Sequence, residues 1–467
     1  MNDDLLTALC DICGDAAVLR DPQQIEPYVT DWRGRYVGKA LAVARPSSAD
    51  QVSEIVRACR AARAVVIPQG GNTGLATGAT PLGCERAVVV NLSRMRRILD
   101  VDPDGYTMAV EAGVVLSDVH DAAARVGRLF PLSLAAQGTA QIGGLISTNA
   151  GGTAVLRYGS MRSLVLGLEV VLSDGRIADG MRALYKDNAG YDWKQLFIGA
   201  EGTLGIVTRA ILRLFPTPRS RVLALAGVDS CHRALALFSA LRASLGETLT
   251  ACELFPDRAL ALRLSHEPAL RRPMPAHPWY VLVEATSALA SMREEAQEVL
   301  LSLSEAGLTG SIVVAQSAAD ERALWEWRET ISETEKRSGP SLKHDVSVPL
   351  SSVPAFIERA TAAIERNFPG TAVLAFGHMG DGNIHFNVLL PPGEIDRDAV
   401  SAAVYTIIAD FRGSITAEHG IGRYRRQELA AHRSASEMYL LHAIKDALDP
   451  ADVMNPGAVL DEFKPAE

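Results

Sequence analysis

The fold is decided by the stretch Pro68-Gln69-Gly70-Gly71-Asn72-Thr73-Gly74-Leu75, which follows the short apolar run at residues 64–67. A glycine-rich loop after a strand is typical of phosphate binding, because small residues let backbone N–H groups approach the anion. A Rossmann dinucleotide site needs G-x-G-x-x-G at the start of a helix and an acidic residue about 20 residues further on. Here the spacing is G-G-x-x-G, residues 76–81 cannot form a good helix, and the strand at 88–92 carries Asn91 near its end. The stretch therefore argues against a Rossmann NAD site and indicates another phosphate-binding loop, with a purely structural turn as the alternative.

The composition is that of a globular chain with large cores. Of its 467 residues, 48% are hydrophobic and 22% are charged. This length suits two or three domains. The net charge of −9 argues against a general affinity for nucleic acid or for an anionic membrane.

The six cysteines predict reduced thiols and a cytoplasmic location. Only Cys10 and Cys13 form a C-x-x-C pair, and no second pair completes a zinc or iron–sulfur set. The stretch Met1-Asn2-Asp3-Asp4 carries two acidic residues and lacks the basic and apolar regions of a signal peptide, and no apolar run reaches membrane-spanning length. We therefore expect no transmembrane segment, so that any link to a respiratory chain is peripheral or passes through a carrier.

The N-terminal half predicts a mixed fold with small-residue turns. Its helices are expected at 49–62 and 116–126, and its strands at 87–92, 97–101, 107–111, 164–172 and 207–215. Residues 131–152 contain five glycines and no charge, which suits a segment lying flat against a planar ligand. Tight internal packing is the alternative for this segment. The sequence Pro216-Thr217-Pro218 marks a domain boundary.

The C-terminal half alternates strands and helices, which predicts an antiparallel sheet covered by helices on one face. Strands are expected at 222–228, 279–285, 311–315, 371–376 and 384–390. On the helix predicted at 320–337, Arg328 and Ser332 are four residues apart and share a face, and Lys343 follows soon after. Such a face can grip a carboxylate, although a solvated charged helix explains an isolated arginine equally well.

Two polar clusters indicate a metal site. The first is Gly377-His378-Met379-Gly380-Asp381-Gly382-Asn383-Ile384-His385-Phe386-Asn387, and the second is Thr416-Ala417-Glu418-His419-Gly420-Ile421-Gly422. Read as strand, turn and strand, the first cluster places His385 and Asn387 on one face, with His378 folded back toward them. Two imidazoles and a carboxylate suit a divalent metal of borderline hardness with positions open for a substrate. A polar loop with ordinary hydrogen-bonding histidines is the alternative for either cluster alone.

Together these motifs resemble the flavin-dependent D-2-hydroxyacid dehydrogenases of the vanillyl-alcohol-oxidase type superfamily, most of all the D-2-hydroxyglutarate dehydrogenases. The resemblance spans residues 40–460. Its anchors are the segments 68–75, 142–152, 157–159, 198–205, 377–387 and 418–422. It implies an α+β fold with a vanillyl-alcohol-oxidase-type FAD-binding domain at 1–218, to which 425–467 return. It also implies a substrate- and metal-binding cap domain at 219–424, with an antiparallel sheet covered by helices.

The resemblance places FAD on a defined set of residues. The set comprises Pro68, Gly70, Gly71, Asn72, Thr73, Gly74, Leu75, Pro131, Gly138, Thr139, Gly143, Gly144, Asn149, Gly152, Tyr158, Gly159, Glu201, Gly202, Gly205, Ile206 and Asn455. Some relatives attach FAD through a histidine just after the paired glycines. Because Asn72 stands there, we expect non-covalent FAD.

The resemblance also implies the reacting groups. The metal ligands are His378, His385 and Glu418; the substrate-binding residues are Arg328, Ser332, Lys343, Asn387 and His419. By this resemblance a metal, zinc with manganese as the alternative, would lower the pKa of the substrate hydroxyl, His419 would be the general base, and hydride would pass to flavin N5. The hydroxyglutarate enzymes usually have threonine at the position of Ser332, and relatives commonly have lysine at those of Arg425 and Ala458.

Several alternatives stay open at this level. The same chemistry on D-lactate or glycolate is the nearest rival, although Asn387 favours D-2-hydroxyglutarate, with D-malate as a related substrate. A non-catalytic flavin subunit of a larger complex predicts a degraded metal set, whereas His378, His385 and Glu418 are present. An oxidase that uses dioxygen is a third reading. We expect a homodimer that passes electrons to an acceptor protein or a quinone-linked carrier.

Overall fold

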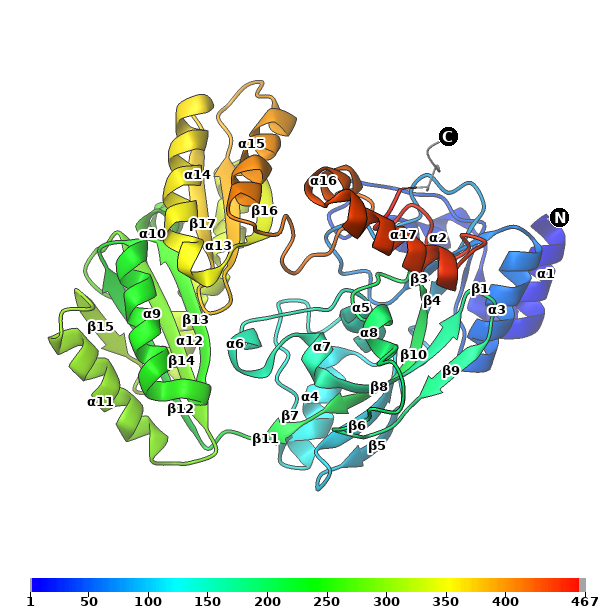
Figure 1. Ribbon diagram of the computed structural model, residues 1–467, viewed down its shortest axis with the longest axis horizontal. Helices are drawn as coiled ribbons and strands as arrows, with labels where there is room; N and C mark the ends of the chain where they lie inside the picture. The colour runs from blue at the N-terminus through cyan, green and yellow to red at the C-terminus, as the bar shows by residue number, and fades with distance from the viewer. Residues whose placement is uncertain (1, 462–467) are drawn as a thin grey trace. The chain divides into compact units, whose positions relative to one another are not determined.

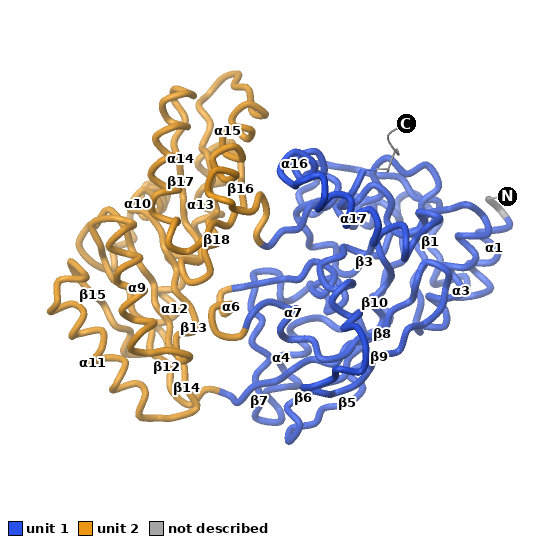
Figure 2. Tube along the Cα trace, viewed as in Figure 1, with its two compact units in different colours: residues 1–152, 159–217, 418–467 blue, residues 153–158, 218–417 orange. Residues whose placement is uncertain are grey.

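The computed structural model describes residues 2–461, which form two compact units (Figures 1 and 2). The first unit contains the described residues of 1–152, 159–217 and 418–467, and the second contains Thr153–Tyr158 and Pro218–Ala417. The chain therefore leaves the first unit at Thr217 and re-enters it at Glu418.

A small sheet in the first unit carries the glycine-rich loop. Its strands are ordered β1 (Val18–Leu19), β2 (Ala42–Ala44), β4 (Ala87–Asn91) and β3 (Val65–Gln69), with β4 parallel to both β2 and β3. On one face, Val66, Val88 and Val90 pack with α1 (Asn2–Cys13) and α3 (Ala49–Ala61). On the other face, Ile67 and Val89 pack with residues of α2 (Pro22–Val29). Burial on both faces explains why these strands are continuous apolar runs.

A second sheet of the first unit is antiparallel, in the order β5 (Ile98–Asp102), β6 (Thr107–Glu111), β10 (Gly205–Arg213), β8 (Val165–Leu172) and β9 (Ile177–Gly180). The strands predicted at 107–111, 164–172 and 207–215 are confirmed to within two residues. The helix predicted at 116–126 is α4 (Leu116–Arg125). The glycine-rich segment 131–152 contains the short helix α5 (Ile142–Ser147), which the sequence pattern did not predict. Short elements of this unit include β7 (Arg128–Leu129), α7 (Met161–Leu164), α8 (Lys194–Phe197), β11 (Phe215–Pro216) and α16 (Arg426–His432). The longer helix α17 (Ala435–Leu448) also belongs to this unit.

The second unit is built on a seven-stranded antiparallel sheet. Its order is β15 (Ser311–Val314), β12 (Ser220–Val228), β14 (Trp279–Ser287), β13 (Leu249–Pro256), β17 (Ala372–His378), β18 (Asn383–Leu389) and β16 (Ser341–Ser347). Five of these strands were predicted. Strands β13 and β16 were not, because polar residues interrupt their apolar pattern, and these residues belong to the candidate site.

Helices lie on both faces of this sheet, rather than on one face as predicted. On one face, Leu374 and Phe376 pack with residues of α10 (Asp257–His266), α12 (Ala318–Glu329) and α13 (Ile331–Ser338). On the other face, Phe386 contacts Phe356 of α14 (Val353–Asn367) and His344 contacts Tyr405 of α15 (Arg397–Asp410). Two further helices, α9 (Cys231–Leu245) and α11 (Met292–Glu305), contact β12 and β14, and the short α6 (Val155–Tyr158) contacts β13. The helix predicted at 320–337 is interrupted at Thr330, so Arg328 and Ser332 belong to consecutive helices.

Candidate active site

A cavity in the first unit is lined by the glycine-rich loop and by α5. Most of the residues predicted to bind FAD line it: Pro68, Gly70, Gly71, Asn72, Thr73, Gly74, Gly143, Gly144, Glu201, Gly202, Gly205 and Ile206. His419, the predicted base, lines the same cavity. Gln141, Ser147 and Thr148 also line it, although the sequence pattern did not single them out.

The loop at the cavity offers hydrogen-bond donors to an anion. Among the described residues, no protein acceptor is found for the backbone N–H groups of residues 71–74. A Cβ at Gly71 would overlap the carbonyl oxygen of Thr139, so only glycine lets the loop pass this close to the neighbouring segment. The buried Oε1 atom of Gln141 also lacks a hydrogen-bond partner in the described part of the chain. Unpaired donors and an orphaned acceptor around one cavity fit a nucleotide that carries phosphates.

Other residues predicted to bind FAD lie outside the set that lines this cavity. They are Leu75, Pro131, Gly138, Thr139, Asn149, Gly152, Tyr158, Gly159 and Asn455. Asn149 accepts hydrogen bonds from the Ser160 hydroxyl and the Arg162 N–H, each at 2.9 Å. Asn455 is buried and donates to the carbonyl oxygens of Gly78 at 2.9 Å and Glu201 at 2.8 Å. Both amides thus hold backbone around the cavity, and Tyr158 belongs to the second unit.

Glu201 fixes the backbone that follows Glu418 and His419. Its carboxylate accepts hydrogen bonds from the N–H groups of Ile421 at 2.7 Å and Gly422 at 2.9 Å. Gly420 has a φ of +77°, which favours glycine, and a Cβ there would lie 2.6 Å from one of the Glu201 oxygens. Burial raises the pKa of Glu201 to about 7, against the lowering effect of the two N–H donors.

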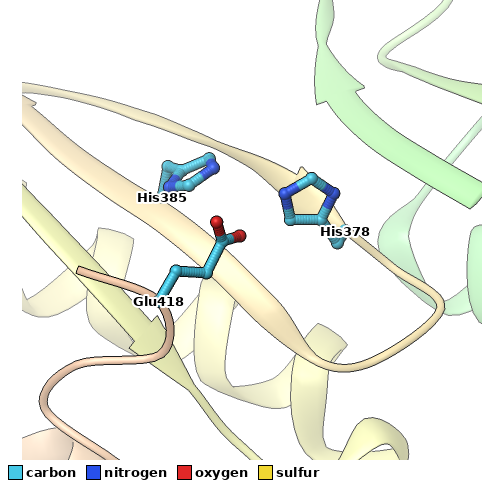
Figure 3. Close-up of side chains that lie close together, drawn as sticks. All are labelled: His378, His385 and Glu418. Atoms are coloured by element: carbon cyan, nitrogen blue, oxygen red, sulfur yellow. The ribbon is translucent and has the colours of Figure 1, made fainter. Parts of the chain in front are cut away.

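The predicted metal ligands lie together. One ligand atom from each of His378, His385 and Glu418 lies within 4.8 Å of the other two, and their side chains point toward one another (Figure 3). His378 ends β17 and His385 lies in β18, so the tight turn between these strands brings both rings to one face. Glu418 is joined to Ala417, whose N–H donates to the Asp345 carbonyl of β16 at 3.0 Å. Two imidazoles and one carboxylate form a donor set that suits zinc or manganese.

Each imidazole also has a carboxylate at its Nδ1 atom. Glu253 Oε1 lies 2.6 Å from His378 Nδ1, and Asp345 Oδ1 lies 3.6 Å from His385 Nδ1. Asn383 Nδ2 donates to Asp345 Oδ1 at 2.8 Å and so holds this carboxylate in place. Metal-binding histidines commonly donate their second ring N–H to a carboxylate. The 2.6 Å contact at His378 is a hydrogen bond of this kind, whereas the 3.6 Å separation at His385 is an ion-pair distance. The surroundings of His378 therefore fit a metal site most clearly.

Three of the five predicted substrate-binding side chains contact two buried glutamates. Arg328 Nε donates to Glu253 Oε2 at 2.7 Å, and Asn387 Nδ2 donates to Glu335 Oε2 at 2.7 Å. Lys343 Nζ lies 3.4 Å from the same Glu335 oxygen. Ser332 is exposed. The register explains the grouping, because Lys343 pairs with Asn387, and Asp345 with His385, across β16 and β18.

Glu253 and Glu335 are functional candidates that the sequence reading missed. Glu253 is the lone charge in the otherwise apolar or small strand β13, which is a signal that can be read without a structure. Glu335 lies seven residues after Arg328, in the next helix, α13, and the break at Thr330 between the two helices hides any shared helical face. Burial raises the pKa of the Glu253 carboxyl, but charge on His378 and Arg328 outweighs this and lowers it below its ordinary value.

No helix in residues 2–461 combines the length and the apolar character needed to cross a bilayer.

Comparison with protein families identifies both halves of the chain. Residues 40–180 match the FAD binding domain model, and residues 217–459 match the model for the C-terminal domain of FAD linked oxidases. Together these matches cover most of the chain. The first half therefore contains an FAD-binding domain, as predicted.

Curated relatives extend this match over nearly the whole length. The D-2-hydroxyglutarate dehydrogenase of Xanthomonas citri pv. viticola is 40% identical over 94% of this chain and 93% of its own. The putative mitochondrial D-lactate dehydrogenase of Schizosaccharomyces pombe is 36% identical over 93% of this chain and 85% of its own. The solved structure of p-cresol methylhydroxylase aligns with a TM-score of 0.78 at 17% identity, covering 98% of this chain and 97% of the other. This likeness confirms the vanillyl-alcohol-oxidase-type fold.

Proposed function

Because the chain belongs to the FAD-linked oxidases, with relatives named D-2-hydroxyglutarate dehydrogenase, we propose that it oxidises D-2-hydroxyglutarate to the 2-oxo acid. One observation carries the proposal: Glu418, in the candidate metal cluster, is followed directly by His419, which lines the FAD-type cavity. One peptide bond thus joins a group that can hold a metal to a group that can take a proton. A 2-hydroxy acid dehydrogenase needs both groups beside its flavin.

On the cofactor side, the chain offers donors for the FAD phosphates, and the position at which some relatives attach FAD through a histidine is Asn72. The N–H groups of residues 71–74 would hold the pyrophosphate, and Asn72 stands where some relatives have the linking histidine. We therefore propose non-covalent FAD. When bound, FAD supplies an acceptor for the hydride at N5.

On the substrate side, the chain's own residues bind the substrate and move a proton. His378, His385 and Glu418 would hold the divalent metal, which would polarise the substrate hydroxyl as a Lewis acid. His419 would take the hydroxyl proton as general base, since a neutral imidazole accepts a proton near pH 7. Glu201 holds the backbone that follows His419 and so restricts where its ring can lie.

Three side chains would bind the substrate carboxylates. Arg328 is held to Glu253 through Nε, which directs its two Nη groups away from that contact as a fork for a carboxylate. Lys343 and Asn387 lie side by side and share Glu335, so they form a second polar subsite. Two subsites suit a dicarboxylate better than a monocarboxylate.

The same chemistry on D-lactate is the second candidate, and the similarity to the Schizosaccharomyces pombe protein supports it. The buried Asn387–Glu335 pair favours D-2-hydroxyglutarate, because a polar group held this rigidly serves a polar partner rather than a methyl group. D-Malate, a shorter dicarboxylate, would be a slower substrate.

We further propose that electrons leave to an acceptor protein or a quinone-linked carrier, and that the protein acts in the cytoplasm as a homodimer. The bacterial relatives support the location. The names of several eukaryotic relatives specify mitochondria, so locating the native protein by cell fractionation is the direct check.

Anaerobic mixing of the purified holoenzyme with single 2-hydroxy acids tests the proposal. D-2-Hydroxyglutarate should bleach the yellow flavin faster than D-malate or D-lactate, and L-2-hydroxyglutarate is the control that should leave it oxidised. Faster bleaching by D-lactate would transfer the assignment to the second candidate. If no 2-hydroxy acid bleaches the flavin, the proposed function is wrong.

A further inference from the structure

One buried carboxylate, that of Glu253, contacts both a predicted metal ligand and a predicted substrate-binding arginine. Glu253 is fully buried. Its Oε1 atom lies 2.6 Å from His378 Nδ1, and its Oε2 atom accepts a hydrogen bond from Arg328 Nε at 2.7 Å. These partners come from β17 and α12, whereas Glu253 comes from β13, where it pairs directly with His378 across the two strands. Neither contact involves a residue of the flavin cavity.

The Glu253 carboxylate determines which ring nitrogen of His378 donates a hydrogen bond and how the Arg328 guanidinium is oriented. An ionised carboxylate only accepts hydrogen bonds, so His378 donates to Glu253 from Nδ1, and Nε2 is the ring nitrogen through which it would bind a metal. The same carboxylate binds Arg328 through Nε, and cation–π contact with Phe376, at 4.9 Å from the ring centroid, supports the guanidinium from a second direction. The orientation of the arginine fork is thereby fixed before substrate arrives.

We propose that Glu253 is a positioning residue that sets the metal affinity of His378 and the carboxylate-binding orientation of Arg328 at the same time. The inference rests on the proposed function, because it requires a metal at His378. It predicts that loss of the Glu253 charge weakens metal binding and substrate binding together. Loss of Arg328 should weaken substrate binding alone.

A merely stabilising ion pair is the competing explanation, and the neighbouring strand provides a control for it. Glu284 of β14 is also buried and also binds an arginine, Arg221, and it accepts from Trp325 Nε1 at 3.0 Å. In the described part of the chain, the side-chain partners found for Glu284 are arginines and Trp325, and none is a histidine of the metal site. Replacing either glutamate with glutamine therefore removes the same kind of pair, but only Glu253→Gln changes a metal ligand.

The experiment measures zinc affinity of the FAD-bound protein by competition with a chromophoric chelator, without turnover. Glu253→Gln should weaken zinc binding by about 10–100-fold, as loss of a carboxylate behind a metal-binding histidine generally does. Glu284→Gln should retain the wild-type zinc affinity. Arg328→Met, which leaves Glu253 on His378, should also retain zinc while KM for D-2-hydroxyglutarate rises by about tenfold. If Glu253→Gln does not fold, Arg328→Met still tests whether the two contacts of Glu253 have separate roles.

The outcomes separate this inference from the proposed function. Equal zinc affinity in wild type and Glu253→Gln would overturn the positioning role, and so would an equal loss in Glu253→Gln and Glu284→Gln. Loss of zinc in Arg328→Met would overturn the division of roles between the two contacts. A wild-type protein that binds zinc no better than a His378→Ala, His385→Ala variant would instead reject the metal site of the proposed function, and the inference with it.

Discussion

Replacing Glu201 with glutamine should remove a pH dependence from the stability of the FAD-free protein. Burial raises the pKa of Glu201 to about 7, from its ordinary value of 4.5. A raised carboxyl pKa means that the folded protein binds the proton more tightly than the unfolded chain. The resulting stabilisation is therefore fully present below about pH 4.5 and is lost as the pH rises through about 7.

The size of the effect follows from the two pKa values. Each pH unit of difference corresponds to about 1.36 kcal/mol, so a rise from 4.5 to about 7 gives about 3 kcal/mol in the free energy of unfolding. Most of this should disappear between about pH 5 and pH 8. Glutamine retains the shape and an oxygen for one of the two N–H donors, but it does not ionise in this range.

Urea-induced unfolding of both proteins across this pH range provides the measurement. The difference between wild type and Glu201→Gln should change by about 2–3 kcal/mol in the direction that makes the wild type relatively less stable at high pH. Parallel pH profiles for the two proteins would show that Glu201 titrates as an ordinary carboxyl and would refute the reasoning.

Three further predictions concern the site. His419→Ala should lower kcat by about 10²–10⁴-fold while the flavin absorbance of the purified protein stays, and near-normal turnover would exclude His419 as the base. Gly71→Ala should force its Cβ against Thr139 at a cost of about 1–3 kcal/mol, so the protein should purify with less FAD; wild-type FAD content would show that the loop can relax. Asn387→Leu should raise the ratio of kcat/KM for D-lactate to that for D-2-hydroxyglutarate by about tenfold, because the donor to Glu335 is lost; an unchanged ratio would remove Asn387 from substrate selection.

The parts of the site that depend on local sequence could be predicted, and those that depend on distant pairing could not. His378 and His385 flank one tight turn between adjacent strands, so their spacing alone brought them together. The glycine loop likewise follows its strand directly, and a cavity opens at it. In contrast, Glu253 meets His378 across 125 residues and Glu335 meets Asn387 across 52, which no local periodicity reveals.

The same distinction applies to the fold. Apolar runs predicted β12, β14 and β17. In contrast, β13 and β16 carry charged residues of the site, which interrupt their apolar pattern, so neither strand was predicted. Without these two strands, the sheet could not be assembled in order, and the second layer of helices could not be placed. Functional residues thus weakened the pattern at β13 and β16, but not at β17 and β18, which also carry site residues and were predicted.

The most direct test of the account is a single anaerobic half-reaction in two preparations of the same FAD-bound protein. One preparation is loaded with zinc at the His378, His385 and Glu418 cluster, and the other is stripped with a chelator and verified free of metal. D-2-Hydroxyglutarate should bleach the flavin in the loaded protein, fail to do so in the stripped protein, and bleach it again once metal is restored. Equal bleaching in both preparations would contradict the claim that a metal at this cluster activates the substrate.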